Sequence, residues 1–94
     1  MIVGVATITL GLPGCGSLKE KRSRLKPLLT RLHKEFNVSA AEVDAQDVWQ
    51  TAVVACALVS NDAKHIQRKL GQLDGWVEAN WPDVDVVDAR VELI

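Results

Sequence analysis

The side chains best suited to chemistry in this sequence are the Lys and Arg residues that gather in one segment. Seven of the eleven Lys and Arg residues lie between positions 17 and 36, where two Glu oppose them, so this segment carries a charge of +5. The rest of the chain carries −6, and the total of −1 hides this polarity. Charge separated in this way favours binding to an anion, such as the phosphates of a nucleic acid.

Spacing divides these cations into a paired and an unpaired group. Glu20 and Arg24 are four residues apart, as are Arg31 and Glu35, so we expect two ion pairs along one flank of a helix. The opposite flank carries cations with no acid at this spacing, next to the backbone amides of a glycine-rich loop at the start of the helix. Anions bind readily at such a helix start.

We therefore predict an anion-binding or nucleic-acid-binding group, which consists of Lys19, Lys21, Arg22 and Lys26. Three of these, Lys19, Arg22 and Lys26, continue to His33 along the unpaired flank and are named here the basic ridge. Lys21 and Arg22 are expected at the margins of the apolar stripe of the helix. The alternative is a solvated helix face whose aliphatic stems cover the edge of the core.

A second polar group surrounds a predicted hairpin and is a candidate partner-binding group. Its members are Glu42, Gln46, Asp47, Trp49 and Gln50. Side chains that both donate and accept hydrogen bonds, together with an aromatic ring, could contact a partner or a base. The alternative is that the polar residues only form the turn and that Trp49 is a core or dimer contact.

The sequence predicts no catalytic residue, no metal site and no cofactor. Cys15 precedes a helix and lies near cations, which favours its thiolate, but no base is placed beside it to support catalysis. His33 and His65 have no neighbouring Cys or carboxylate at the spacing of metal ligands. Cys15 and Cys56 do not suggest a disulfide framework, so we expect a reducing cytoplasm. No apolar run has the length of a membrane span.

Apolar periodicity and turn residues predict six elements. They are a strand over residues 2–12, a helix over 17–37, strands over 38–43 and 48–59 joined by a hairpin at 44–47, a helix after residue 62, and a strand over 84–93. Ser17 and Glu20 match a capping box, and Pro27 is expected to kink or break the helix. The order βαββαβ predicts a single ferredoxin-like α+β domain over residues 1–94, with a four-stranded antiparallel sheet and two helices on one face.

The strand predicted over residues 48–59 is apolar at both odd and even positions, which is typical of a strand covered on both faces. Two helices on one face leave the other face of the sheet open. We expect a second copy of the chain to cover this face in a homodimer. The alternative is an open face of small Ala and Thr side chains that tolerates water.

Four stretches of the sequence resemble motifs of the bacterial YlxP-like family, whose function is unknown. They are residues 12–14, 17–22, 36–43 and 46–52, and the likeness covers nearly the whole chain. The resemblance implies a ferredoxin-like fold. It also suggests an RNA or ribosome partner, because family members are often encoded beside translation-initiation and ribosome-maturation factors. The sequence departs from the pattern of this family at two positions. Ala45 stands where relatives often carry His, and Pro27 lies within a helix that is usually free of proline.

Together these observations favour a small, non-enzymatic cytoplasmic protein that contacts RNA or the ribosome through its first helix and does not bind membranes. A different class is a ligand-sensing or protein-scaffold homodimer, with the hairpin group at the subunit boundary. Acylphosphatases share the order of elements and hold phosphate at the first loop. The loop here lacks Arg, and the hairpin strands carry no Asn to orient water, which argues against such a hydrolase.

Overall fold

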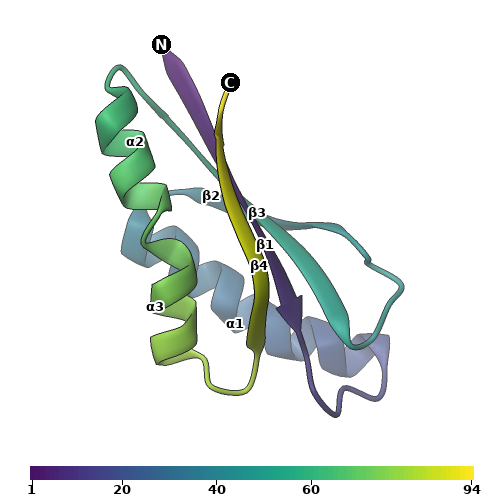
Figure 1. Ribbon diagram of the computed structural model, residues 1–94. Helices are drawn as coiled ribbons and strands as arrows, with labels where there is room; N and C mark the ends of the chain where they lie inside the picture. Colours follow the sequence, from purple (N-terminus) through teal and green to yellow (C-terminus); the bar gives the residue numbers. More distant parts are fainter.

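The computed structural model describes residues 1–94 and confirms the ferredoxin-like α+β fold. Its elements are β1 (Ile2–Gly11), α1 (Leu18–Phe36), β2 (Ser39–Asp44), β3 (Thr51–Ser60), α2 (Ala63–Leu70), α3 (Leu73–Asn80) and β4 (Asp85–Leu93). The four strands form one antiparallel sheet in the order β2-β3-β1-β4 (Figure 1). Both termini lie at the same end of the sheet, because β1 and β4 are neighbours.

Helix α1 begins and ends where its sequence signals place it. The Ser17 hydroxyl accepts a hydrogen bond from the Glu20 amide at 3.1 Å, and Asn37 ends the helix in the left-handed conformation with φ 52°. Pro27 lies inside the helix on its exposed side. Of the two expected outcomes, a kink or a break, the break does not occur: α1 runs unbroken for 19 residues, with the proline ring directed to solvent.

The core lies between the sheet and the helices. Residues at even positions of β1 and β3 face the helices, and they include Ala6, Ile8, Val54 and Cys56. The apolar residues Ile66, Leu70, Leu73 and Val77 of the second helical segment are buried against them. At Gly4 the sheet and α2 approach so closely that a Cβ would overlap Ile66. Glycine is therefore required there for close packing.

The second helical segment differs from the single helix expected, because it is divided into α2 and α3. Asp62 caps α2 by accepting from the amides of Lys64 and His65. The helix then ends at Gly71, where a Cβ would come within 2.8 Å of the Gln67 carbonyl oxygen. Two weak helix formers, Gly71 and Gly75, make this segment easy to interrupt, and each half keeps its apolar side on the core.

The hairpin also differs from its prediction, since β3 begins at Thr51 and not at residue 48. Val48 and Trp49 lie in the connecting loop and are about half exposed, at 47% and 45%. The loop carbonyls of Ala45 and Val48 accept hydrogen bonds from a side chain of α1, described below, and the Ala45 carbonyl also accepts from the Val48 amide at 3.0 Å. Ala45 adopts φ 57°, which turns the chain toward that side chain.

The odd positions of β1 and β3 form the face of the sheet that no helix covers. They include Val3, Val5, Val53, Ala55 and Val59. Thr7, Thr9 and Thr51 lie on the same face, so its two central strands present mainly Val, Ala and Thr side chains. No helix is both long and apolar enough to cross a membrane.

Candidate functional site

The basic ridge lies on an exposed flank of α1. Lys19, Arg22 and Lys26 are all exposed, and their side chains form no ion pair or hydrogen bond within the chain. Spacings of three and four residues place them on one side of the helix. His33 continues the ridge, and its ring is held by a contact of 2.8 Å between Nδ1 and the Val38 carbonyl oxygen.

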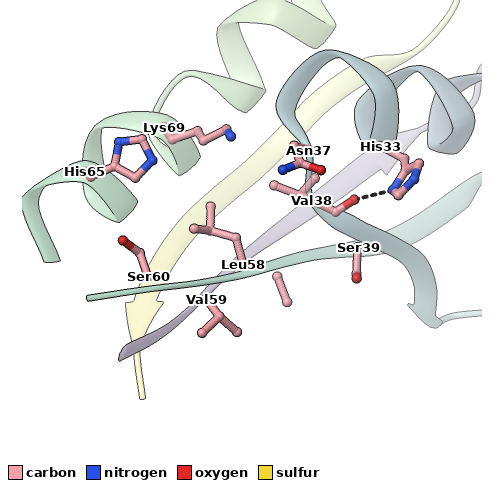
Figure 2. Close-up of a pocket in the computed structure, with 10 residues that line it drawn as sticks. His33, Asn37, Val38, Ser39, Leu58, Val59, Ser60, His65 and Lys69 are labelled. Carbon is pink, nitrogen blue, oxygen red and sulfur yellow. Dashed lines mark hydrogen bonds between the residues drawn. The ribbon is translucent and has the colours of Figure 1, made fainter. Parts of the chain in front are cut away.

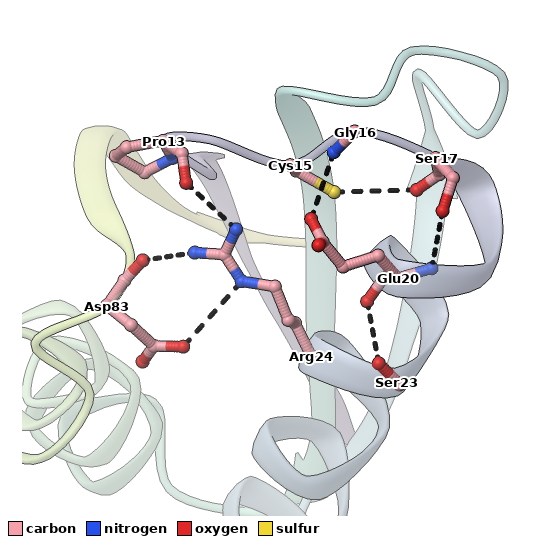
Figure 3. Close-up of polar contacts among 8 residues, drawn as sticks. All are labelled: Pro13, Cys15, Gly16, Ser17, Glu20, Ser23, Arg24 and Asp83. Carbon is pink, nitrogen blue, oxygen red and sulfur yellow. Dashed lines mark hydrogen bonds and ion pairs between the residues drawn. The ribbon is translucent and has the colours of Figure 1, made fainter.

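The other flank of α1 is neutralised by the protein itself. Arg31 pairs with Glu35 at 3.2 Å, as its spacing predicts, and its guanidinium also lies over the Trp76 ring. Arg24 donates to the Pro13 carbonyl oxygen at 3.0 Å and to the Asp83 carbonyl oxygen, and it lies 3.7 Å from the Asp83 carboxylate (Figure 3). Arg24 and Arg31 are therefore occupied, which leaves the three cations of the basic ridge and Lys34, in the last turn of α1, without an internal partner.

The predicted ion pair between Glu20 and Arg24 does not form. Glu20 instead turns back and accepts a hydrogen bond from the Gly16 amide at 2.9 Å, which completes the capping box (Figure 3). This bond from Gly16 is the main cause that lowers the pKa of Glu20, helped by the Cys15 thiol and the charge of Arg24. The carboxylate closes the helix start, so the loop amide of Gly16 is not free for an external anion.

Lys21 is a correction to the predicted anion-binding group. Its side chain is 1% exposed, and its ammonium donates to the Ala45 and Val48 carbonyl oxygens at 2.6 Å each. The same nitrogen lies 2.7 Å from Glu42 Oε2. A buried ammonium with three oxygen partners cannot contact an external phosphate. Lys21 therefore ties α1 to the β2–β3 hairpin and belongs to the structure of the site, not to its surface.

The sequence contained a signal for this burial. Lys21 lies four residues before Leu25 and seven before Leu28, which places it on the buried face of the helix and not at its margin. A Lys in an apolar stripe requires an internal acceptor. The acceptors here come from residues more than twenty positions away, so the helix pattern alone does not identify them.

Glu42 is likewise engaged inside the protein. It lies on the helix-facing side of β2, its side chain is 18% exposed, and its Oε2 atom is buried. No hydrogen bond of good geometry reaches that oxygen, so the nearby ammonium of Lys21 is what balances its charge. Glu42 is thus held by an internal partner, whereas the sequence placed it among the partner-binding residues.

The rest of the hairpin group lies at the surface, close to the start of α1. Gln46, Asp47 and Trp49 are exposed. Gln50 is held in place, since its side chain donates to the Cys15 carbonyl oxygen at 3.0 Å and its backbone carbonyl accepts from the Leu12 amide at 2.8 Å. These bonds, with those of Lys21, bring the hairpin loop and the N-terminal end of the basic ridge to the same end of the molecule.

A shallow groove of about 270 Å³ runs along the ridge between α1 and β2. Arg22 and Lys26 form its cationic wall, Leu25 and Leu29 its apolar wall, and Glu42 lines the side of β2. The sequence did not reveal this groove, because it depends on how α1 packs on the edge strand. The groove combines cations that have no internal partner with apolar surface. This combination suits contact with both the phosphates and the bases of a nucleic acid.

Neither cysteine is placed for nucleophilic chemistry. Both thiols are buried, and the Cys15 thiol donates to the Ser17 carbonyl oxygen at 3.5 Å. Burial raises the pKa of the Cys56 thiol to about 11, which keeps it protonated at neutral pH. No cluster of three or more His, Cys, Asp or Glu side chains that could hold a metal ion is present.

Comparisons with known proteins show a family and leave the function open. Residues 3–91 match the family described as Protein of unknown function (DUF503). The chain is also 33% identical, over 91 residues, to the Uncharacterized protein YlxP of Bacillus subtilis (strain 168), which covers 97% of this chain and 98% of that protein.

Proposed function

The chain belongs to the DUF503 family of unknown function, and from that premise we propose that it is a non-enzymatic protein that binds RNA, alone or in the ribosome, through the basic ridge. The observation that carries the proposal is the set of three exposed cations, Lys19, Arg22 and Lys26, none of which has an acidic partner. Such cations gain affinity by releasing counterions from a phosphate backbone. Two free, buried thiols fit a cytoplasmic location.

The hairpin loop adds a contact that phosphate-binding cations cannot supply. Trp49 is 45% exposed and lies in a loop that Lys21 fastens to α1 and Gln50 fastens to the β1–α1 loop. An exposed indole beside a cationic flank can stack on an unpaired base, which contributes about 1–3 kcal/mol per base. This favours an RNA with a single-stranded loop over a continuous duplex.

The proposal is tested by fluorescence anisotropy with a labelled RNA hairpin that has a single-stranded loop. The ridge variant K19Q/R22Q/K26Q should bind at least about tenfold more weakly, because it loses three phosphate contacts. The matched control K64Q/R68Q removes two exposed cations from α2 and should bind like the parent. Equal affinities of the parent and the ridge variant would refute the assignment.

We also propose that a second copy of the chain covers the open face of the sheet. The centre of this face is mainly apolar. Its border, on β4, carries both positive and negative charge, with Asp88 opposite Thr9 and Arg90 opposite Thr7 of β1. A two-fold axis places a patch against itself, so a border that contains both signs is self-complementary.

Analytical ultracentrifugation tests this dimer. Ala55→Lys puts a charge at the centre of the open face and should yield a monomer, whereas Ala79→Lys, at an exposed position of α3, should not change the mass. A parent protein that stays monomeric at high concentration would exclude the dimer. That result would leave the RNA proposal intact, because the ridge lies on the opposite, helical layer.

A further inference from the structure

A cavity of about 360 Å³ lies at the far end of α1 from the hairpin loop. Its walls come from the C-terminal end of α1, the start of β2 and helix α2, with His33 and Asn37 on one side and His65 and Lys69 on the other (Figure 2). The end of β3 forms the floor, where Leu58 and Ser60 face the helices and the Val59 side chain points to the opposite face of the sheet (Figure 2). This volume falls at the lower end of the range of pockets for small molecules, about 300–1,000 Å³.

The cavity is lined by basic groups and by no acid. His65 and Lys69 are four residues apart on α2 and therefore share one face of that helix. Neither side chain has a hydrogen-bond or ion-pair partner in the protein. Figure 2 shows the Lys69 side chain reaching from α2 across the cavity toward Asn37. A cation beside the apolar side chain of Leu58, with no carboxylate in the cavity, is arranged to meet an anion from outside.

The strand at the floor offers a backbone donor as well. Pairing between β2 and β3 ends at Ser39 and Ala57, whereas β3 continues to Ser60 against β1. The Val3 carbonyl accepts from Ile94, so Val3 directs its backbone groups toward β4. Val59 lies opposite Val3, and hydrogen-bonded and non-hydrogen-bonded pairs alternate along an antiparallel ladder. The N–H of Val59 therefore points away from β1, to the side where β2 no longer runs beside β3. That N–H has no strand partner there.

His33 is fixed in a state that also suits this site. A carbonyl oxygen only accepts, so the contact of 2.8 Å with Val38 places the proton of the His33 ring on Nδ1. The Nε2 atom is then free of protein partners. It accepts a hydrogen bond when the ring is neutral and donates one when the ring is charged.

We propose that this cavity binds a small phosphorylated molecule, a phosphate monoester whose carbon portion lies against Leu58. A phosphate dianion has three terminal oxygens, and the ammonium of Lys69, the His65 ring, the Asn37 amide and the Val59 N–H supply enough donors for all of them. A carboxylate has only two oxygens and would leave part of this donor set unused. The site is separate from the three cations of the basic ridge and goes beyond the proposed RNA contact.

The test is a two-dimensional amide NMR titration of the full chain with glycerol 3-phosphate, and with succinate at matched ionic strength. Glycerol 3-phosphate should produce saturable shifts at residues 37, 58–60, 65 and 69. In K69Q its affinity should fall about tenfold, the effect of losing one charge-assisted hydrogen bond. K64Q removes a cation from the same helix that does not line the cavity, and it should bind like the parent.

Three results would overturn the proposal: no saturable shift at these residues, equal weakening in K64Q and K69Q, or succinate binding as tightly as glycerol 3-phosphate. Lys69 has no internal partner, so K69Q should keep the thermal stability of the parent, and K69R should retain binding. The ridge variant K19Q/R22Q/K26Q separates the two proposals. It should lose RNA affinity and keep the response to glycerol 3-phosphate.

Discussion

Lys21→Met tests how the site is built, because it removes a buried charge and keeps most of the side-chain volume. In the parent, the ammonium lies 2.6 Å from each of two carbonyl oxygens and 2.7 Å from Glu42 Oε2, with the Lys21 side chain 1% exposed. The variant leaves Glu42 Oε2 and the Val48 carbonyl oxygen without a donor, whereas the Ala45 carbonyl oxygen keeps its hydrogen bond from the Val48 amide at 3.0 Å. Removing one partner of a buried ion pair costs about 3–5 kcal/mol.

The lower end of that range applies here. Glu42 is 18% exposed and the loop is at the surface, so water reaches part of the freed oxygens. We therefore expect Lys21→Met to reduce the free energy of unfolding by about 3 kcal/mol. A domain of this size has a total stability of about 5–15 kcal/mol, so the loss is a large share. Urea unfolding followed by Trp fluorescence measures it directly.

Two further variants decide whether the ion pair is the cause. The double variant K21M/E42Q removes the stranded carboxylate charge, so it should be more stable than K21M alone. Lys26→Met, on the exposed ridge, should change stability by less than about 0.5 kcal/mol. A loss below about 1 kcal/mol in Lys21→Met would refute the reasoning, since an exposed Lys would behave in the same way.

Three other changes have defined outcomes. Gly4→Ala should lower stability by about 1–3 kcal/mol in urea unfolding because its methyl group would overlap Ile66, whereas Gly75→Ala, with open space around it, should raise stability by about 0.5–1 kcal/mol. Iodoacetamide should leave Cys56 unmodified in the folded protein up to pH 9, since burial raises its thiol pKa to about 11, and rapid labelling there would contradict that burial. The pKa of Glu20 is lowered in the folded state, so its stabilising effect is present above its ordinary value of 4.5 and is lost as the pH falls through the folded value. The stability of Glu20→Gln should accordingly fall below the parent at pH 6 and converge with it in acid, and a gap that stays constant with pH would show that the charge is not the cause.

Local signals in the sequence predicted most of the fold. The capping box at Ser17 and Glu20 and the apolar stripe that follows it define α1. The apolar spacing after Asp62 indicates the helical segment that packs beside it. These patterns depend on residues within a few positions of one another, and the order of the elements then restricts the sheet to few arrangements.

The features that the sequence did not reveal depend on distant contacts. The spacing of Lys21 places it on the apolar side of α1, but its acceptors, the carbonyls of Ala45 and Val48, cannot be identified until the hairpin loop is placed beside the helix. The same contacts shorten β3 and leave Trp49 in a loop. Three of the four predicted anion-binding residues therefore lie at the surface. The fourth, Lys21, is buried and holds the hairpin loop against α1.

The salt dependence of RNA affinity tests the central proposal most directly. With Lys19, Arg22 and Lys26 each neutralising one phosphate, the slope of log affinity against log salt should be about −2 to −3 per subunit. The ridge variant K19Q/R22Q/K26Q should flatten that slope toward zero. A parent slope near zero, or one that the ridge variant leaves unchanged, would contradict the proposal that these three side chains contact a phosphate backbone.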